Sequence, residues 1–280
     1  MEAPPKHTLY LVGTPIGNME DITFRAVRVL KEVSLVAAED TRRAKILFAR
    51  HGIQTPLTSY HEQGQSSKAN VIVRKLAEGD VALISEAGMP SISDPGFGLV
   101  RAALAAGLTV EAIPGPSAVT TAVAVSGLAA DRFLFLGFLP RTGSQRRKAL
   151  APFGSQPYTL VILESPHRIK ECLRDLQSAL GQRRIAVCRE LTKVHEEVFR
   201  GTVAEALSHF QEPRGEYTLV VEGALIEAET ASDEELAARL MELEAGGLSS
   251  RDSVAQVAKE TGLPRRQVYG VSLGLRQAEP

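Results

Sequence analysis

Charged residues that directly follow apolar segments give this 280-residue chain its first candidates for acid–base chemistry. Glu39 and Asp40 stand together just before Thr41, Arg42 and Arg43. A carboxylate within hydrogen-bond reach of a substrate hydroxyl can accept its proton and accelerate a reaction by about 10²–10⁴-fold. Arg42 could orient such a carboxylate or bind a phosphate. The alternative is that Asp40 only caps a helix that begins at Thr41.

Two further carboxylates and two histidines follow later apolar segments. Glu86 begins an irregular run of small residues over 85–96, and Glu164 lies just before His167. Either carboxylate could act as a general base, and His167 and His195 could act as acid–base groups, although a surface histidine beside a turn is the more common case. The spacing of His, Cys, Asp and Glu fits no metal site, so we predict no bound metal.

Short apolar runs alternate with helical stretches and must position these side chains. The strand-like runs cover residues 8–12, 34–38, 81–85 and 109–113, and the helical stretches between them cover 21–33, 41–50, 67–78 and 97–106. This βαβ alternation predicts a mostly parallel sheet with helices on both faces. A second α/β unit has strand-like runs at 133–138, 158–164, 185–189, 198–202 and 217–222. Its closely spaced last strands predict a mixed sheet.

The run Pro114-Gly115-Pro116 breaks the chain between the two units. We predict an N-terminal α/β domain over residues 1–115, a C-terminal α/β domain over 116–228, and an acidic linker with a helical tail over 229–280. In the tail, small and apolar residues precede Gly262, and a basic segment follows. This order is typical of a helix-turn-helix module that binds nucleic acid, or of a simple packing hairpin.

Three unusual segments follow strand-like runs, at residues 13–18, 85–96 and 114–118. Ligands of open α/β sheets bind beyond the carboxyl ends of the strands. Glycines in the first segment would let the backbone approach a ligand, and Ser117 begins a helix with free N–H groups. The alternatives are that these segments are only tight turns or a break between two domains. We expect a ligand pocket where the two domains meet.

Composition and charge narrow the class of protein. With 44% hydrophobic and 23% charged residues, the chain is typical of a folded globular protein. Residues 141–200 hold 12 Lys and Arg against 6 Asp and Glu, a basic block that could attract a polyanion or form an ordinary solvated surface. No secretion signal, membrane-spanning run or C-x-x-C pair is present, so we expect a cytoplasmic protein with no membrane contact.

Several of these runs together resemble a known family. The run Val12-Gly13-Thr14-Pro15-Ile16-Gly17-Asn18 resembles the opening loop of the tetrapyrrole methylase superfamily. Pro15 and Ile16 replace the usual central Gly-Pro of that loop and Asn18 replaces Asp, which argues against a tetrapyrrole substrate. Residues 39–42, 60–62, 85–96 and 164–168 resemble the 16S ribosomal RNA methyltransferases of this superfamily.

The resemblance implies a fold, a cofactor and a substrate. The fold is two α/β domains with S-adenosylmethionine bound in the cleft between them, usually in a homodimer. The reaction is methylation of the ribose 2′-hydroxyl of a cytidine in 16S ribosomal RNA, near the decoding site, so the partner is 16S RNA or the small ribosomal subunit. By position, the cofactor site would be lined by Ile16, Gly88, Ser91, Ser117, Ala118 and Leu163.

Methyl transfer to an RNA hydroxyl needs a proton acceptor and residues that bind the RNA. Asp40, Glu39 and Glu164 are the candidate catalytic residues, with Asp40 first because Arg42 lies beside it. The candidate RNA-binding residues are Arg42, Arg146, Arg147, Lys148, Arg168 and Lys193. Two alternatives stay open, namely a related methyltransferase that acts on a tetrapyrrole or on diphthine, and a non-catalytic RNA-binding assembly factor.

Overall fold

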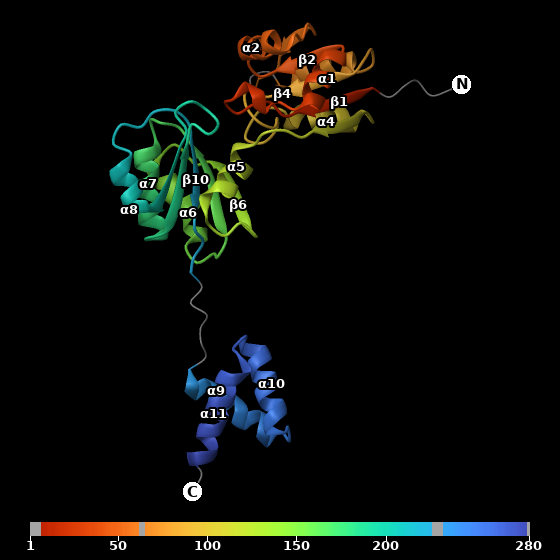
Figure 1. The fold of residues 1–280 in the computed structure, drawn as a ribbon. Helices are drawn as coiled ribbons and strands as arrows, with labels where there is room; N and C mark the ends of the chain where they lie inside the picture. The colour runs from red at the N-terminus through yellow and green to blue at the C-terminus, as the bar shows by residue number, and fades with distance from the viewer. Residues whose placement is uncertain (1–6, 62–64, 226–231, 279–280) are drawn as a thin grey trace, which may run out of the picture. The chain divides into compact units, whose positions relative to one another are not determined.

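The computed structural model describes residues 7–61, 65–225 and 232–278. The chain divides into two compact units, Met1–Ala224 and Leu225–Pro280. The first unit contains two five-stranded sheets, one in each of two lobes, here called the first lobe (residues 7–113) and the second lobe (residues 118–224) (Figure 1). Across the described ranges, no helix is both long and apolar enough to cross a membrane.

The first sheet is parallel throughout, as the βαβ alternation predicts. Its strand order is β3-β2-β4-β1-β5. The short strand β3 was not expected, because its three residues are all only half-buried and lack an apolar run. The strands are β1 (Thr8–Val12), β2 (Leu35–Ala38), β3 (Leu57–Ser59), β4 (Val81–Ile84) and β5 (Thr109–Ile113).

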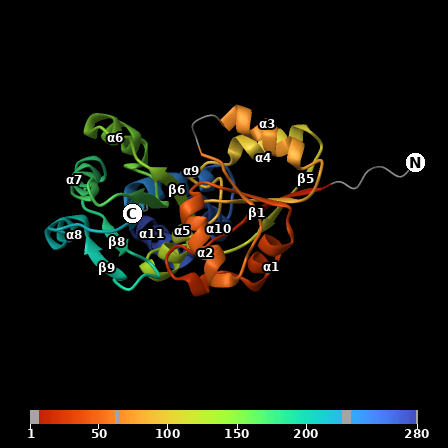
Figure 2. The same ribbon diagram turned by 90° about the horizontal axis from the view of Figure 1, so that it is seen from above.

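Helices cover both faces of this sheet (Figure 2). Alternate strand residues point to opposite faces. Leu9 and Leu83 therefore pack under α3 (Gln65–Lys75) and α4 (Phe97–Ala105), whereas Val12 and Ile84 pack under α1 (Phe24–Glu32) and α2 (Thr41–His51). A short 3₁₀ turn, η1 (Met19–Asp21), precedes α1. The carboxyl ends of the buried strands are thereby held at one edge of the sheet.

The second sheet is mixed, as its spacing predicts, with strand order β6-β7-β10-β8-β9. Only β6 and β7 pair in parallel, and the other neighbours are antiparallel. The strands are β6 (Phe133–Phe138), β7 (Thr159–Glu164), β8 (Arg184–Arg189), β9 (Glu197–Thr202) and β10 (Tyr217–Val221).

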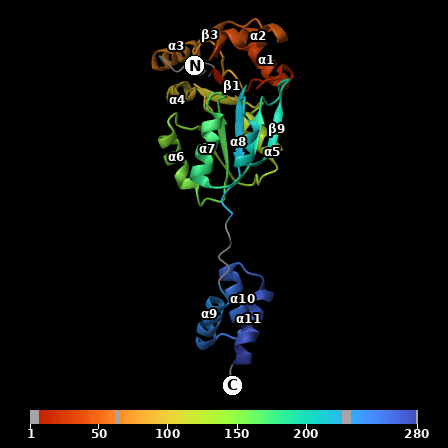
Figure 3. The ribbon, with the colours of Figure 1, turned by 90° about the vertical axis from the view of Figure 1, so that its left-hand side faces the viewer.

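Helix α5 (Ala118–Ser126) packs on one face of the second sheet. The opposite face is covered by α6 (Gly143–Leu150), α7 (Ile169–Leu180) and α8 (Val203–His209) (Figure 3). Helix α6 was not predicted, because its polar run of Gly, Ser, Gln, Arg and Lys lacks an apolar periodicity. Packing against the second sheet stabilises α6, because the helix buries Leu150 and the side chain of Arg146.

The C-terminal unit is a three-helix module with its own apolar core. Leu236, Leu240, Val257 and Val268 are almost fully buried in it. The basic residues at the start of the last helix remain exposed. The helices are α9 (Asp233–Ala245), α10 (Ser250–Thr261) and α11 (Arg265–Ala278).

Candidate functional site

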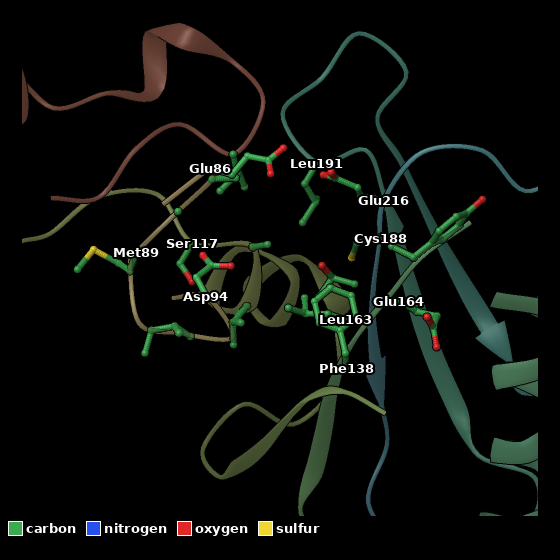
Figure 4. Close-up of a pocket in the computed structure, with 18 of the residues that line it drawn as sticks. Glu86, Met89, Asp94, Ser117, Phe138, Leu163, Glu164, Cys188, Leu191 and Glu216 are labelled. Atoms are coloured by element: carbon green, nitrogen blue, oxygen red, sulfur yellow. The ribbon is translucent and has the colours of Figure 1, made fainter. Parts of the chain in front are cut away.

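The carboxyl ends of the strands of both lobes enclose a cavity of about 460 Å³, here called the main cavity. Side chains and backbone from the segments after β1, β2, β4 and β5 line one part. The other part is lined by residues of β6, of the carboxyl ends of β7 and β8 with the segments that follow them, and of the start of β10. Figure 4 shows apolar side chains such as Leu163 and Leu191 in its interior, with Glu86, Asp94 and Glu216 also lining it. An apolar cavity with few polar groups is the usual form of a small-molecule site.

Five of the six residues expected to line the cofactor site do line this cavity: Ile16, Gly88, Ser117, Ala118 and Leu163. Ser91 is the exception. Its backbone has a positive φ of 71°, and its hydroxyl is buried beside Gly96, where an added Cβ would stand within 2.3 Å of it. Ser91 thus packs within the 85–96 loop, against Gly96, and is not among the residues that line the cavity.

Close backbone contacts hold the loops of the first lobe around the cavity. Thr14 N donates to Gly88 O at 2.9 Å, and Gly88 N donates to Thr14 O at 3.1 Å. A Cβ at Gly13 would stand 2.8 Å from Gly115 Cα. Gly13 therefore allows two loops of the protein to come into close contact, whereas the sequence suggested that it lets the backbone approach a ligand.

The N-terminus of α5 opens on the main cavity. Ala118 and Val119 line it, and Ser117 precedes them in an extended conformation without forming a side-chain cap. The first N–H groups of a helix have no partner within the helix. This end of α5 can therefore donate to a bound polar group.

Three carboxylates of the first lobe line the cavity: Glu39, Glu86 and Asp94. Glu39 Oε2 accepts from Glu86 N at 3.2 Å, and Arg43 pairs with Glu86 at 2.5 Å. Burial, together with the charge of Glu39, raises the pKa of Asp94 to about 6. The sequence presented Asp94 as part of a simple Asp-Pro-Gly turn, and only its place in the long 85–96 loop was a sign of function.

Glu164 also lines the cavity, but its carboxyl group lies on the side opposite Asp94 (Figure 4). The group is fully buried, with Oε1 accepting from Ser165 N at 2.8 Å and Oε2 lying 3.4 Å from Arg168. Burial, reinforced by the charge of Glu164, raises the pKa of Cys172 to about 12. Glu164 therefore belongs to a buried polar network behind the cavity.

Asp40 lies outside the main cavity and caps α2. Its Oδ1 accepts from Arg42 N at 2.8 Å, and its Oδ2 accepts from Arg42 Nη2 at 2.8 Å. These bonds lower the pKa of Asp40 to about 2. Asp40 was the first candidate for the catalytic base, and its place at the N-terminus of α2 together with its lowered pKa favours the alternative role as a helix cap.

Arg146, a predicted RNA-binding residue, is buried and paired in the structure. Its side chain is 1% exposed, and its Nε donates to Asp175 at 2.7 Å. Arg147 contacts the same carboxylate at 2.5 Å from a half-exposed position, and Lys148 is exposed. The basic run is helical, so its side chains are spread around the helix axis, and Arg146 faces the packed side while Arg147 and Lys148 reach solvent.

The other candidate RNA-binding residues differ in how exposed they are and in how strongly they are paired within the protein. Arg42 is 89% exposed despite its bond to Asp40. Arg168 donates to the carbonyls of Leu139 and Pro140, at 2.7 and 3.0 Å, and is mostly buried. Lys193 is 29% exposed and pairs with Glu190 and Glu216, each at 2.9 Å. Among the residues that the structure describes, no group of three or more His, Cys, Asp and Glu could hold a metal ion.

Comparison with known proteins places the chain in a family. A profile described as Tetrapyrrole (Corrin/Porphyrin) Methylases matches residues 8–207, and one described as RsmI C-terminal HTH domain matches residues 230–276. A relative from Halalkalibacterium halodurans is 45% identical over 273 residues, which is 95% of this chain and 94% of the relative. One from Thermotoga maritima is 48% identical over 218 residues, 77% of this chain and 98% of the relative. Both are named ribosomal RNA small subunit methyltransferase I.

Solved structures share the fold of the first unit at low identity. Diphthine synthase has a TM-score of 0.60 at 14% identity, covering 77% of this chain and 89% of that chain. The methyltransferase CobJ has a TM-score of 0.60 at 17% identity, covering 79% and 95%. The expected fold class, enzyme class and S-adenosylmethionine cofactor are confirmed by these matches and the profiles. The chain belongs to the ribosomal RNA small subunit methyltransferase I family, within the S-adenosylmethionine-dependent tetrapyrrole methylases.

Proposed function

We propose that this protein methylates the ribose 2′-hydroxyl of a cytidine in 16S ribosomal RNA, near the decoding site, in the bacterial cytoplasm. The observation that carries the proposal is the main cavity, where both lobes of a methyltransferase fold meet beside exposed arginines. Relatives at 41–48% identity named for small-subunit ribosomal RNA support the substrate. The working form is a homodimer, as the family resemblance implies.

The residues of the main cavity fit S-adenosylmethionine. A volume of about 460 Å³ lies within the range of small-molecule sites, which is roughly 300–1,000 Å³. Ile16, Leu163 and Leu191 offer apolar contact to an adenine ring, and the N-terminus of α5 offers N–H donors to a carboxylate. Asp94 and Glu39 offer negative charge to a sulfonium or ammonium group. When bound, this cofactor supplies an electrophilic methyl group.

The main task of the protein is to hold the acceptor hydroxyl in line with that methyl group. Orientation of this kind can recover about 7–11 kcal/mol of the barrier. The hydroxyl must also lose its proton, and we assign Glu86 as the acceptor. Its side chain is 38% exposed at the edge of the cavity, where Arg43 holds it at 2.5 Å. Glu39 and Asp94 lie deeper and are better placed to face the cofactor.

The RNA is held by cations that remain accessible around the cavity. Arg42, Arg43 and Lys148 are exposed and can bind phosphates. Arg147, Lys193 and Arg168 stay in the proposed RNA-binding set, but each must share its charge with a carboxylate of the protein. The exposed arginines of α11 add a second basic surface on the C-terminal module.

The test uses radiolabelled S-adenosylmethionine and small ribosomal subunits from a strain that lacks this gene. We expect one methyl group per 16S RNA, recovered as 2′-O-methylcytidine after nuclease digestion and mass spectrometry. Naked 16S RNA is assayed in parallel to identify the true substrate form. Calorimetric binding of the cofactor without any transfer to RNA would favour a related methyltransferase with another substrate, and no cofactor binding would favour the non-catalytic alternative. Sedimentation of the full chain tests the homodimer.

A further inference from the structure

A second cavity, of about 270 Å³, lies next to the main cavity. It is here called the side cavity. The two share five lining residues, Ile16, Arg43, Glu86, Ala87 and Glu216, so they are separated only by a common wall. The other two cavities detailed for the described part of the chain share no residue with the main cavity. An acceptor bound in the side cavity would therefore lie directly beside a methyl donor bound in the main cavity.

The side cavity has two apolar walls. One is formed by Ile46 and Leu47 of α2, and the other by Pro15, Ile16 and Met19 of the loop after β1. Ile46 lines this cavity and is 61% exposed, so its side chain is accessible from solvent. A slot between apolar side chains is the environment in which enzymes hold a base that has left its stack.

Charged groups stand only on the shared wall and its rim. Arg43 pairs with Glu86 at 2.5 Å, and Lys193 pairs with Glu216 at 2.9 Å. Figure 4 shows Glu86 and Glu216 at the same end of the main cavity, away from Glu164. Both cations can pass from a carboxylate to a phosphate when RNA arrives, because each pair is at least partly exposed and a surface pair contributes only about 0–1 kcal/mol.

We propose that the side cavity receives the single nucleotide whose ribose is methylated, with its base between α2 and the loop after β1. This inference rests on the proposed function. The ribose then lies at the shared wall, with its 2′-hydroxyl beside Glu86 and facing the main cavity. Arg43 and Lys193 flank the two adjoining phosphates.

The same arrangement explains a preference for cytosine. Glu216 reaches the side cavity from the second lobe, and its carboxylate can accept a hydrogen bond from the exocyclic amine of cytosine, as acidic side chains do in nucleic-acid recognition. Uracil presents a carbonyl oxygen at that position, which a carboxylate repels. The side cavity thus selects the base, while the main cavity holds the methyl donor.

Bulky substitutions at the mouth test the proposal. Ile46→Trp and Met19→Trp fill the side cavity from its two walls, and Ala49→Trp is the matched control, since Ala49 is exposed on the same helix and lines neither cavity. Cofactor affinity is measured by calorimetry and methyl transfer to small subunits by single-turnover kinetics. We expect both cavity variants to lose on the order of 10²-fold in transfer rate while their cofactor affinity stays that of Ala49→Trp.

Two results would overturn the proposal. Transfer at the Ala49→Trp rate by both cavity variants means that the nucleotide binds elsewhere, and weakened cofactor binding assigns the side cavity to the cofactor. If wild-type protein itself transfers no methyl group to ribosomal RNA, the proposed function fails, independently of the variants.

The methionines give a readout that needs no substitution. Met19 lines the side cavity, Met89 lines the main cavity, and Met241 lies in the C-terminal unit. With ¹³C-methyl methionine, S-adenosylhomocysteine should shift Met89, and cytidine monophosphate added next should shift Met19 but not Met241. Uridine monophosphate should act more weakly. The proposal is contradicted if cytidine monophosphate, added at saturating S-adenosylhomocysteine, does not shift the Met19 signal.

Discussion

Gly17 of the first lobe lies directly against Lys193 of the second. A Cβ at Gly17 would stand 2.5 Å from Lys193 Cγ and 2.9 Å from the carbonyl oxygen of Leu191. Beside it, Asn18 N donates to Thr192 Oγ1 at 2.9 Å. The two lobes therefore meet at close range beside the side cavity, and we expect this contact to set how far apart the lobes stand around the main cavity.

Gly17→Ala should widen the cavity, because backbone atoms at 2.9 Å cannot be avoided by a side-chain rotation. We expect weaker cofactor binding and a lower melting temperature, measured by calorimetry and scanning fluorimetry. Gly270→Ala is the control, since its Cβ would meet nothing within 4 Å and its φ is not positive. Unchanged cofactor affinity in Gly17→Ala would mean that this contact does not set the width of the site.

Asp94 should make cofactor binding depend on pH. Its pKa is raised to about 6, so the carboxyl is mainly neutral at pH 5 and ionised at pH 7.5. Affinity for the cationic cofactor should rise across this interval in wild type and stay flat in Asp94→Asn. Calorimetry at several pH values measures it, and a wild-type affinity independent of pH would remove Asp94 from the cofactor site.

The same carboxyl should weaken the fold at neutral pH. Its pKa is higher in the folded chain than the ordinary value of 3.8, so its contribution to stability is complete below about pH 3.8 and is lost as pH rises through about 6. Asp94→Asn should thus raise the melting temperature at pH 7.5 and leave it nearly unchanged at pH 4. A lower melting temperature at pH 7.5 would contradict this assignment.

Variants of Glu86 and Asp40 should have different effects, since we assign Glu86 to proton transfer and Asp40 to the cap of α2. Glu86→Gln is expected to lower the transfer rate by about 10²–10⁴-fold without changing cofactor affinity. Asp40→Ala is expected to lower the melting temperature of the protein, since it removes the cap of α2, and to leave the transfer rate per folded molecule near wild type. Equal losses of rate in the two variants would argue against Glu86 as the proton acceptor.

The basic helix α6 should divide into a structural and an RNA-binding part. Arg146→Met leaves Asp175 buried without its main partner, so we expect a loss of about 3–5 kcal/mol in the free energy of unfolding. Lys148→Ala should leave stability unchanged and reduce the salt slope of RNA binding by about 0.7. Urea denaturation and filter binding at several salt concentrations measure both. A salt slope that Lys148→Ala leaves unchanged would take α6 out of the RNA interface.

Removal of residues 225–280 should leave cofactor binding intact, because these residues form a separate compact unit with its own core. The relative from Thermotoga maritima matches over only 77% of this chain while spanning 98% of its own length, so a shorter chain exists in the family. We expect weaker binding of small subunits by the truncated protein, measured by sedimentation. Loss of cofactor affinity would instead make the tail part of the catalytic unit.

The sequence by itself determined the fold class and the family. Alternation of apolar runs such as 81–84 with helical stretches indicated the parallel sheet, and the close spacing of the last strands indicated the mixed sheet. The resemblance to the family also located five residues of the main cavity, and the strand-end loops independently indicated a pocket where the two lobes meet. Patterns that repeat along the chain are set by local geometry and can be read without coordinates.

Only the tertiary structure decided which of the charged residues face the cavity. Asp40 and Glu39 are neighbours in sequence, yet one caps a helix and the other lines the site. Arg146 and Lys148 share one basic run, yet one is buried against Asp175 and the other meets solvent. Adjacent side chains on a helix or turn point in different directions, and the elements packed around them decide which direction leads to a ligand, to a buried partner or to water.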